Sequence, residues 1–336
     1  MSLLGPGLVL LFCLSQALRD VYFGHVFQGV DFFAVILLAF LLSTAIFTAV
    51  ALLRSPAAFR KLRGHGRTVL AMNISTALAW SCYFFALTHI EPSVVNTLHS
   101  GMAPLTVLAL AACGARLAKT EAIGWTERAG YGGMVLALGA LCWVVLSGRS
   151  GLATGDAATA LLGLGLLLVS GASITISLLY SKRLQDAGVN AEVVTAVRYI
   201  ALIALAAGVV ASKGGLRGIE TVGDVVTLSA LTTILIVLPL YAFQVGVGLT
   251  APLTAQVLRS LGPVFVFAAQ QIDGRLVYST PTLVCIVMYS VAAIMANVAH
   301  GWHPKPRAPS GTESDQSLAS TFSAYRPPLR RAQAGP

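Results

Sequence analysis

The sequence of 336 residues is 56% hydrophobic and only 10% charged, and its mean hydropathy is +0.80. A typical soluble domain has about 25% charged residues, so this composition excludes an ordinary soluble enzyme and predicts a polytopic membrane protein. The net charge of +9 gives little support to a nucleic-acid partner, because the basic residues are not interleaved with aromatic residues on a soluble module.

Apolar runs long enough to cross a bilayer recur along the chain. A transmembrane helix needs about 20 apolar residues, and we expect about ten such helices in an all-α polytopic membrane protein. In chain order, the predicted spans cover residues 3–24, 31–53, 68–89, 93–115, 128–147, 157–180, 190–211, 223–248, 252–272 and 278–300.

Two segments in different halves of the chain are imperfect copies of each other. A single offset pairs Ser100 with Arg259 and Pro104 with Pro263, in the predicted fourth and ninth spans. Proline-interrupted hydrophobic segments at matching places in two halves indicate the binding site of a secondary transporter.

The duplication divides the chain into a first five-helix repeat at 1–150 and a second at 151–302. Because five is odd, the second repeat enters the membrane from the opposite side, and we expect inverted repeats with a site between them. Residues 303–336 are rich in proline, serine and charged side chains, which predicts a disordered cytoplasmic tail.

The distribution of Lys and Arg predicts the orientation. Most basic residues outside the spans fall at 54–67, 116–128, 182–183 and in the tail, and few fall in the alternate loops. Under the positive-inside rule, both termini are expected to be cytoplasmic. The heavy use of Ala, Leu, Gly and Val favours a bacterial inner membrane as the location.

Several short stretches resemble a known family. They are Ala86-Leu87 to Pro104-Leu105, Gly262-Pro263 and Val197-Arg198-Tyr199. With the two five-span units, these stretches resemble the drug/metabolite transporter superfamily, in particular its EamA-like permeases and, more distantly, its sugar-phosphate and nucleotide-sugar transporters. The turns Gly114-Ala115-Arg116 and Asp273-Gly274-Arg275 lack the glutamate that EamA-like permeases usually carry there. The resemblance implies transport by alternating access.

Arg259 is the strongest candidate for contact with a substrate. It lies within the predicted ninth span, four residues before Pro263, and a charge at such a depth is a functional-site hypothesis by default. Gln256 lies one turn earlier on the same helical face. The resemblance to sugar-phosphate transporters implies that Arg259 contacts an anion. The alternative is a structural arginine paired with backbone carbonyls or an acidic residue.

The predicted fourth span supplies a facing group of polar residues. Asn96, Ser100 and Pro104 recur every four residues, and His99 is adjacent. A histidine can contact substrate or carry a proton near physiological pH. Alternatively, His99, Ser100 and Asn96 are hydrogen-bonded packing residues that hold helices together.

Three further residues are candidates for the binding site. Tyr83 and Tyr241 are matched by the duplication and would line the cavity, although aromatic residues near helix ends also form interfacial belts. Arg198 would be a second buried cation, or its long side chain would extend to the membrane surface. A stripe of serines in the sixth span fits either a cavity wall or helix packing; it comprises Ser170, Ser173 and Ser177.

The carboxylates offer weaker candidates. Glu91 lies in the predicted turn between the third and fourth spans, where a coupling role competes with simple solvation. Arg19 and Asp20 are expected to form an ion pair near the end of the first span.

These patterns together predict a secondary transporter that moves a small polar or anionic metabolite across the lipid bilayer. The alternatives are a broad-specificity exporter of amino acids or toxic compounds and, with less support, a non-transporting membrane protein or membrane enzyme. We find no phosphate-binding loop and no zinc-like spacing, so no cofactor, no metal and no enzymatic activity are expected. The expected partners are the substrate and the bilayer, and a homodimer is compatible with the sequence.

Overall fold

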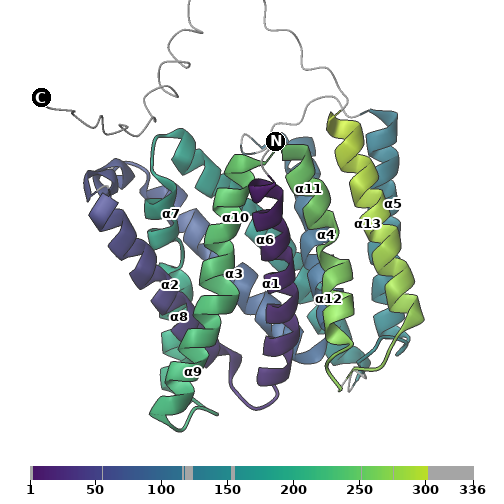
Figure 1. The fold of residues 1–336 in the computed structure, drawn as a ribbon, viewed down its shortest axis with the longest axis horizontal. Helices are drawn as coiled ribbons and strands as arrows, with labels where there is room; N and C mark the ends of the chain where they lie inside the picture. The colour runs from purple at the N-terminus through teal and green to yellow at the C-terminus, as the bar shows by residue number, and fades with distance from the viewer. Residues whose placement is uncertain are drawn as a thin grey trace, which may run out of the picture. The chain divides into compact units, whose positions relative to one another are not determined.

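The protein is helical throughout the part that the structure describes. The computed structural model describes residues 3–54, 56–115, 117, 124–152, 156–250, 252–274 and 276–301, and for 56–58, 240, 241, 244, 245, 247, 248, 252 and 301 it describes the backbone alone. These residues contain no β-strand. Figure 1 shows the helices, which are α1 (Leu4–Val26), α2 (Phe32–Arg54), α3 (Gly66–His89), α4 (Pro92–Ala112), α5 (Trp125–Leu146), α6 (Ala157–Asp186), α7 (Ala191–Arg198), α8 (Ile200–Ser212), α9 (Val222–Thr232), α10 (Leu238–Leu249), α11 (Pro252–Ser260), α12 (Gly262–Gln270) and α13 (Thr280–Gly301). A 3₁₀ segment, η1 (Pro56–Leu62), precedes α3, and a π-helical segment, η2 (Thr233–Val237), joins α9 to α10.

Eight helical segments in the described residues are long and apolar enough to cross a membrane. They are α1 to α6, the combined α7–α8 segment and α13. This confirms the prediction of an all-helical chain and agrees with a multi-pass membrane protein. The predicted eighth and ninth spans fall instead on shorter helices, α9 to α10 and α11 to α12. The count of ten spans therefore stays a prediction.

Local sequence explains where the helices break and end. Pro239 is the second residue of α10, just after η2, and lacks the N–H that would continue the regular helical bonding. Pro263 is in the first turn of α12, just after the break at Leu261, whereas its predicted counterpart Pro104 lies inside the continuous helix α4. Gly148 has φ +68° after the end of α5, a left-handed conformation that glycine adopts without strain and that ends many helices.

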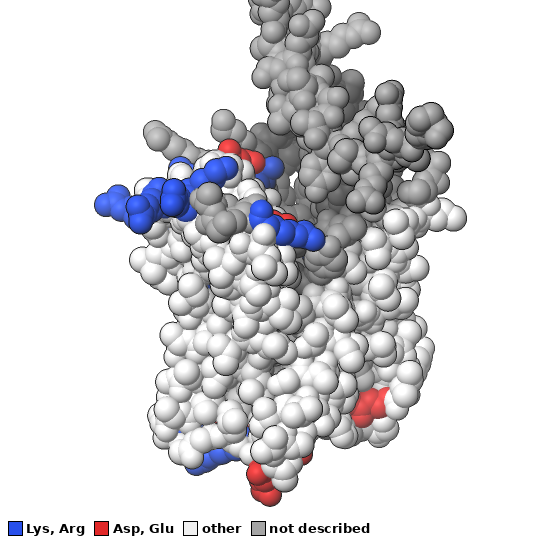
Figure 2. All heavy atoms as spheres, turned by 60° about the vertical axis from the view of Figure 1, so that its left-hand side comes forward, with Lys and Arg blue, Asp and Glu red and all other residues white. Residues whose placement is uncertain are grey.

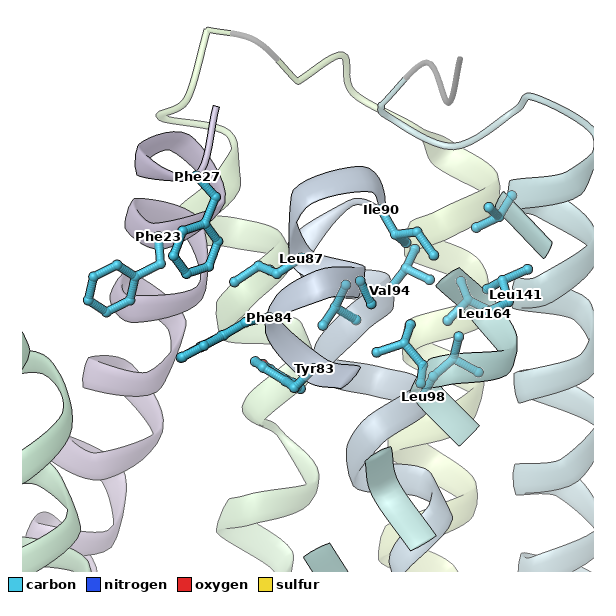
Figure 3. Packing of buried hydrophobic residues seen from close by; sticks show 14 of the residues in the cluster. Phe23, Phe27, Tyr83, Phe84, Leu87, Ile90, Val94, Leu98, Leu141 and Leu164 are labelled. Atoms are coloured by element: carbon cyan, nitrogen blue, oxygen red, sulfur yellow. The ribbon is translucent and has the colours of Figure 1, made fainter. Parts of the chain in front are cut away.

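Close packing holds the helices together. In a bilayer, lipid tails are as apolar as leucine, so helices associate mainly through close contacts and hydrogen bonds. α3 packs along α6, and α1 packs along α10 and α12. Figure 3 shows the largest buried cluster, in which Phe23, Phe84, Leu98 and Leu141 are buried with neighbouring aliphatic side chains.

Charged side chains lie mainly at the two ends of the helices. In the view of Figure 2, the surface between the ends is almost free of Lys, Arg, Asp and Glu. Large apolar side chains are exposed on it, among them Leu136, Trp143 and Leu161. An uncharged apolar exterior of this kind is what lipid contact requires.

Candidate functional site

A cavity of about 280 Å³ lies between α1, α4, α5, α6, α11, α12 and α13. Its polar lining comprises Gln16, Asn96, Ser100, Thr175, Gln256, Arg259, Ser260 and Asn297, and its aromatic lining comprises Phe12, Tyr131 and Tyr289. Mostly apolar walls with a few placed polar groups are typical of small-molecule sites. No Asp or Glu is among the described residues that line it.

Arg259 carries the positive charge of this cavity. Its guanidinium carbon lies 5.2 Å from the ring centre of Phe243, and the Phe243 ring lies 4.4 Å from that of Phe12. Among the described residues, no hydrogen-bond acceptor or carboxylate pairs with it. An ionised side chain away from bulk water is unfavourable unless it is paired, so this guanidinium calls for water or an anion inside the cavity.

The predicted partners on α4 face the same cavity. Asn96, Ser100 and Pro104 line it from α4, and Gln256 and Arg259 line it from α11. The structure therefore brings four of the eight predicted binding residues together, from the two segments that the duplication relates. Their geometry fits contact with a ligand, and the sequence pattern at helical spacing was sufficient to find them.

Behind Asn96 lies an ion pair in the protein interior. Arg19 donates from Nε and Nη2 to Oδ1 of Asp20, at 2.9 and 2.7 Å, and the two residues are 6% and 0% exposed. The rings of Trp80 and Tyr83 lie 5.4 and 5.7 Å from the guanidinium carbon. The expected pair thus forms, but it is enclosed by α3 and α4. The burial of the pair could have been predicted from the sequence, because two opposite charges occur side by side within an apolar run.

Tyr83 and His99 belong to the helix packing behind the cavity wall. Their ring centres lie 4.7 Å apart, and neither side chain lines the cavity. His99 Nδ1 is 3.0 Å from Ser170 Oγ, which donates to the carbonyl of Ala79 at 2.7 Å. Because that hydroxyl proton is used, we assign the imidazole proton to Nδ1. This arrangement supports the packing interpretation of both residues.

Arg198 lies away from the cavity. It is half-buried at the break between α7 and α8, and its Nε donates to Thr76 Oγ1 at 3.3 Å. Thr76 also bonds to Ser177 of α6, so the predicted serine stripe serves contact between α3 and α6. The side chain of Tyr241, the last of the eight predicted residues, lies outside the described part of the chain.

Two features of the site region, the lining by α13 and the burial of Glu91, were not predicted from the sequence. Tyr289 and Asn297 of α13 line the cavity two helical turns apart. Their spacing can be read from the sequence, but the duplication matches them with no residues in the first half of the chain. Glu91 was expected to be as near water as other turn carboxylates, yet it is only 1% exposed. The donors that enclose it come from remote segments, which the sequence order does not reveal.

No group of three or more His, Cys, Asp or Glu side chains that could hold a metal ion occurs in the described residues. The cavity instead offers one cation, several carboxamides and hydroxyls, and aromatic faces. Chemically, this set can bind and orient an anionic or polar molecule.

The fold is similar to that of a protein of known structure, although no family model or curated sequence matches the chain. No protein-family model matches the sequence, and no curated protein matches it. A solved structure described only as "Crystal structure of protein" aligns with 90% of this chain and 98% of its own, with a TM-score of 0.60 and 18% sequence identity. At that identity the likeness concerns the fold alone: this chain has a helical fold similar to that of the solved protein.

Proposed function

We propose that this protein is a secondary transporter that moves a small polar or anionic metabolite across a membrane by alternating access. The observation that carries the proposal is the guanidinium of Arg259, which has no acceptor or carboxylate among the described residues and lies in a cavity whose walls come from both halves of the chain. A purely structural arginine would be expected to have an acceptor or a carboxylate, as Arg19 has in Asp20.

The broken helices support the ten-span arrangement within this proposal. If α9, η2 and α10 together cross once and α11 and α12 together cross once, the chain has ten spans, in two units of five at 1–150 and 151–302. Discontinuous helices around a midplane site recur in transporters built from inverted repeats. We place both termini in the cytoplasm of a bacterial inner membrane, following the positive-inside rule.

Uptake into proteoliposomes tests the substrate class. We expect saturable uptake or exchange for a carboxylated or phosphorylated compound, with inhibition by other anions. A matched panel of neutral compounds serves as the control. Transport of neutral compounds without any anion transport would contradict the anion assignment and favour the broad-specificity exporter.

A further inference from the structure

Glu91 is a buried carboxylate that takes no part in the cavity. Both of its oxygens accept hydrogen bonds: Oε1 from Ser93 Oγ at 2.8 Å and from Gln270 Nε2, and Oε2 from the backbone N–H of Gly151 at 2.7 Å. Oε2 also accepts a longer bond of 3.4 Å from Thr282 Oγ1, which shares its proton with Ser279 Oγ at 2.9 Å. No Lys or Arg among the described residues pairs with the carboxylate. We call Glu91 and the four residues that donate to it the Glu91 junction.

The junction joins four separate segments of the chain. Glu91 and Ser93 lie at the start of α4, Gly151 follows α5, Gln270 ends α12, and Thr282 begins α13. Three further hydrogen bonds connect the same segments. They run from Ser279 Oγ to the carbonyl of Arg149, from the N–H of Ser93 to Gln270 Oε1, and from the N–H of Val277 to the carbonyl of Gly151.

The cavity lies toward the other end of these helices. It is lined by α4 from Asn96 to Val107, by Tyr131 near the start of α5, by Gly262 at the start of α12 and by the later part of α13 up to Asn297. Four of the helices that line the cavity, α4, α5, α12 and α13, are therefore tied together just beyond one end of it. In Figure 1, that end is opposite the one where the N-terminus of α1 lies.

Gly151 shows how closely the junction is packed. A Cβ at this position would lie 2.4 Å from the carbonyl oxygen of Val277 and 3.3 Å from Glu91 Oε2. Only glycine lets the turn after α5 approach both the carboxylate and the segment before α13. The segments that follow α5 and precede α13 are thus in close contact with each other and with the carboxylate.

We propose that the Glu91 junction is the gate that closes the cavity at this end, and that it opens in the alternate state of the transport cycle. The inference rests on the proposed transport function. A single carboxylate suits this role because one group holds four segments, so a movement that withdraws it releases all of them. Four donors satisfy it in the closed state, and water can replace them in the open state.

Replacing the carboxylate by a carboxamide should weaken the closed state. In Glu91→Gln one carboxylate oxygen becomes an NH₂ group, which cannot accept a hydrogen bond. The hydrogen bonds that this oxygen accepted are therefore lost. Glu127→Gln is the matched control, because Glu127 is also buried at 4% exposure but bonds to Tyr131 and His300 at the cavity's end of the helices.

Cys13 provides a native reporter, since it lines the cavity. The other cysteines, Cys82, Cys113, Cys142 and Cys285, are replaced by alanine, and a small membrane-impermeant anionic methanethiosulfonate is added to right-side-out or inside-out vesicles. In the otherwise unchanged protein, Cys13 should react from one face only. In Glu91→Gln, reaction from the closed face should rise at least about tenfold, while Glu127→Gln should keep the unmodified closed-face rate.

The proposal is overturned if folded Glu91→Gln shows an unchanged closed-face rate, or if the unmodified junction already allows reaction from both faces. If Glu91→Gln does not fold, Ser93→Ala and Thr282→Val each remove one donor to the carboxylate and should raise the rate at which Cys13 reacts from the closed face. The gate would also be overturned if neither variant raised that rate. Labelling needs no substrate, so a protein with a working gate but no uptake of any solute would refute transport and leave the gate standing.

Discussion

Asn96 on α4 donates a hydrogen bond from Nδ2 to Oδ2 of Asp20 on α1 at 2.9 Å. Asn96 also lines the cavity, so this one bond connects the cavity wall to the buried ion pair of Arg19 and Asp20. A ligand that competes for the carboxamide therefore acts on a group that also supports the packing of α1 against α4.

Asn96→Ala should lower stability, because one oxygen of the Asp20 carboxylate loses its donor. We expect a loss of about 1–2 kcal/mol, seen as a lower midpoint of thermal unfolding in detergent. Ser100→Ala is the control: Ser100 lines the same cavity one turn later and makes no hydrogen bond within the described residues, so its midpoint should stay unchanged. Equal midpoints for the two variants would count against the bond.

Removing one partner of the ion pair should be more harmful than removing both. Asp20→Leu leaves the Arg19 guanidinium uncompensated, for which we expect a loss of about 3–5 kcal/mol. The double variant Arg19→Met with Asp20→Leu removes both charges and should recover much of that loss. Unfolding midpoints of the wild type, both single variants and the double variant give the coupling energy between Arg19 and Asp20. If the losses of the two single variants simply added up in the double variant, the buried ion pair would be contradicted.

Gly171→Ala should separate α4 from α6. A Cβ there would lie 2.5 Å from the Met102 Cβ and 2.6 Å from the His99 carbonyl oxygen, so we expect a loss of about 1–3 kcal/mol from overpacking. On the same helix, Gly165 has nothing within 4 Å of such a Cβ, and Gly165→Ala should be neutral or slightly stabilising. Equal unfolding midpoints for Gly171→Ala and Gly165→Ala would show that α4 and α6 pack less closely than in the structure.

Reporter fusions test the proposed orientation. A phosphatase that is active only outside the cytoplasm should be inactive when fused after Arg67 and active when fused after Lys213. A reporter that is active only in the cytoplasm should give the reverse pattern. The same side for both positions would contradict the assigned topology.

Much of the fold could be predicted from the sequence, because long continuous apolar runs form helices in a bilayer. The interruptions were harder to predict: Pro104 and Pro263 share a position in the duplication, yet only Pro263 lies at a helix break, since Leu261 there leaves the regular helical bonding. Helical spacing grouped Asn96 with Ser100 on one helix and Gln256 with Arg259 on another, and both groups line the same cavity.

The remaining features depend on contacts between distant segments. The enclosure of Glu91 requires a glycine after α5 and a threonine on α13, which no local pattern connects to the turn before α4. Tyr83 was placed in the site because the duplication matches it with Tyr241, and His99 because it is adjacent to Ser100. Their rings instead pack against each other, and His99 also bonds to α6; contacts of this kind are set by the tertiary arrangement.

The most direct test of the account is the initial rate of anion uptake into proteoliposomes by Arg259→Gln, compared with wild type and Arg259→Lys at equal amounts of folded protein. Removing the charge should abolish saturable anion uptake and change the unfolding midpoint little, because the guanidinium contacts the Phe243 ring but has no hydrogen-bond acceptor or carboxylate among the described residues. Lysine keeps a charge without the planar fork of the guanidinium, so we expect residual uptake with a raised KM. Uptake by Arg259→Gln at the wild-type rate, or its failure to fold, would contradict the claim that Arg259 binds the transported anion.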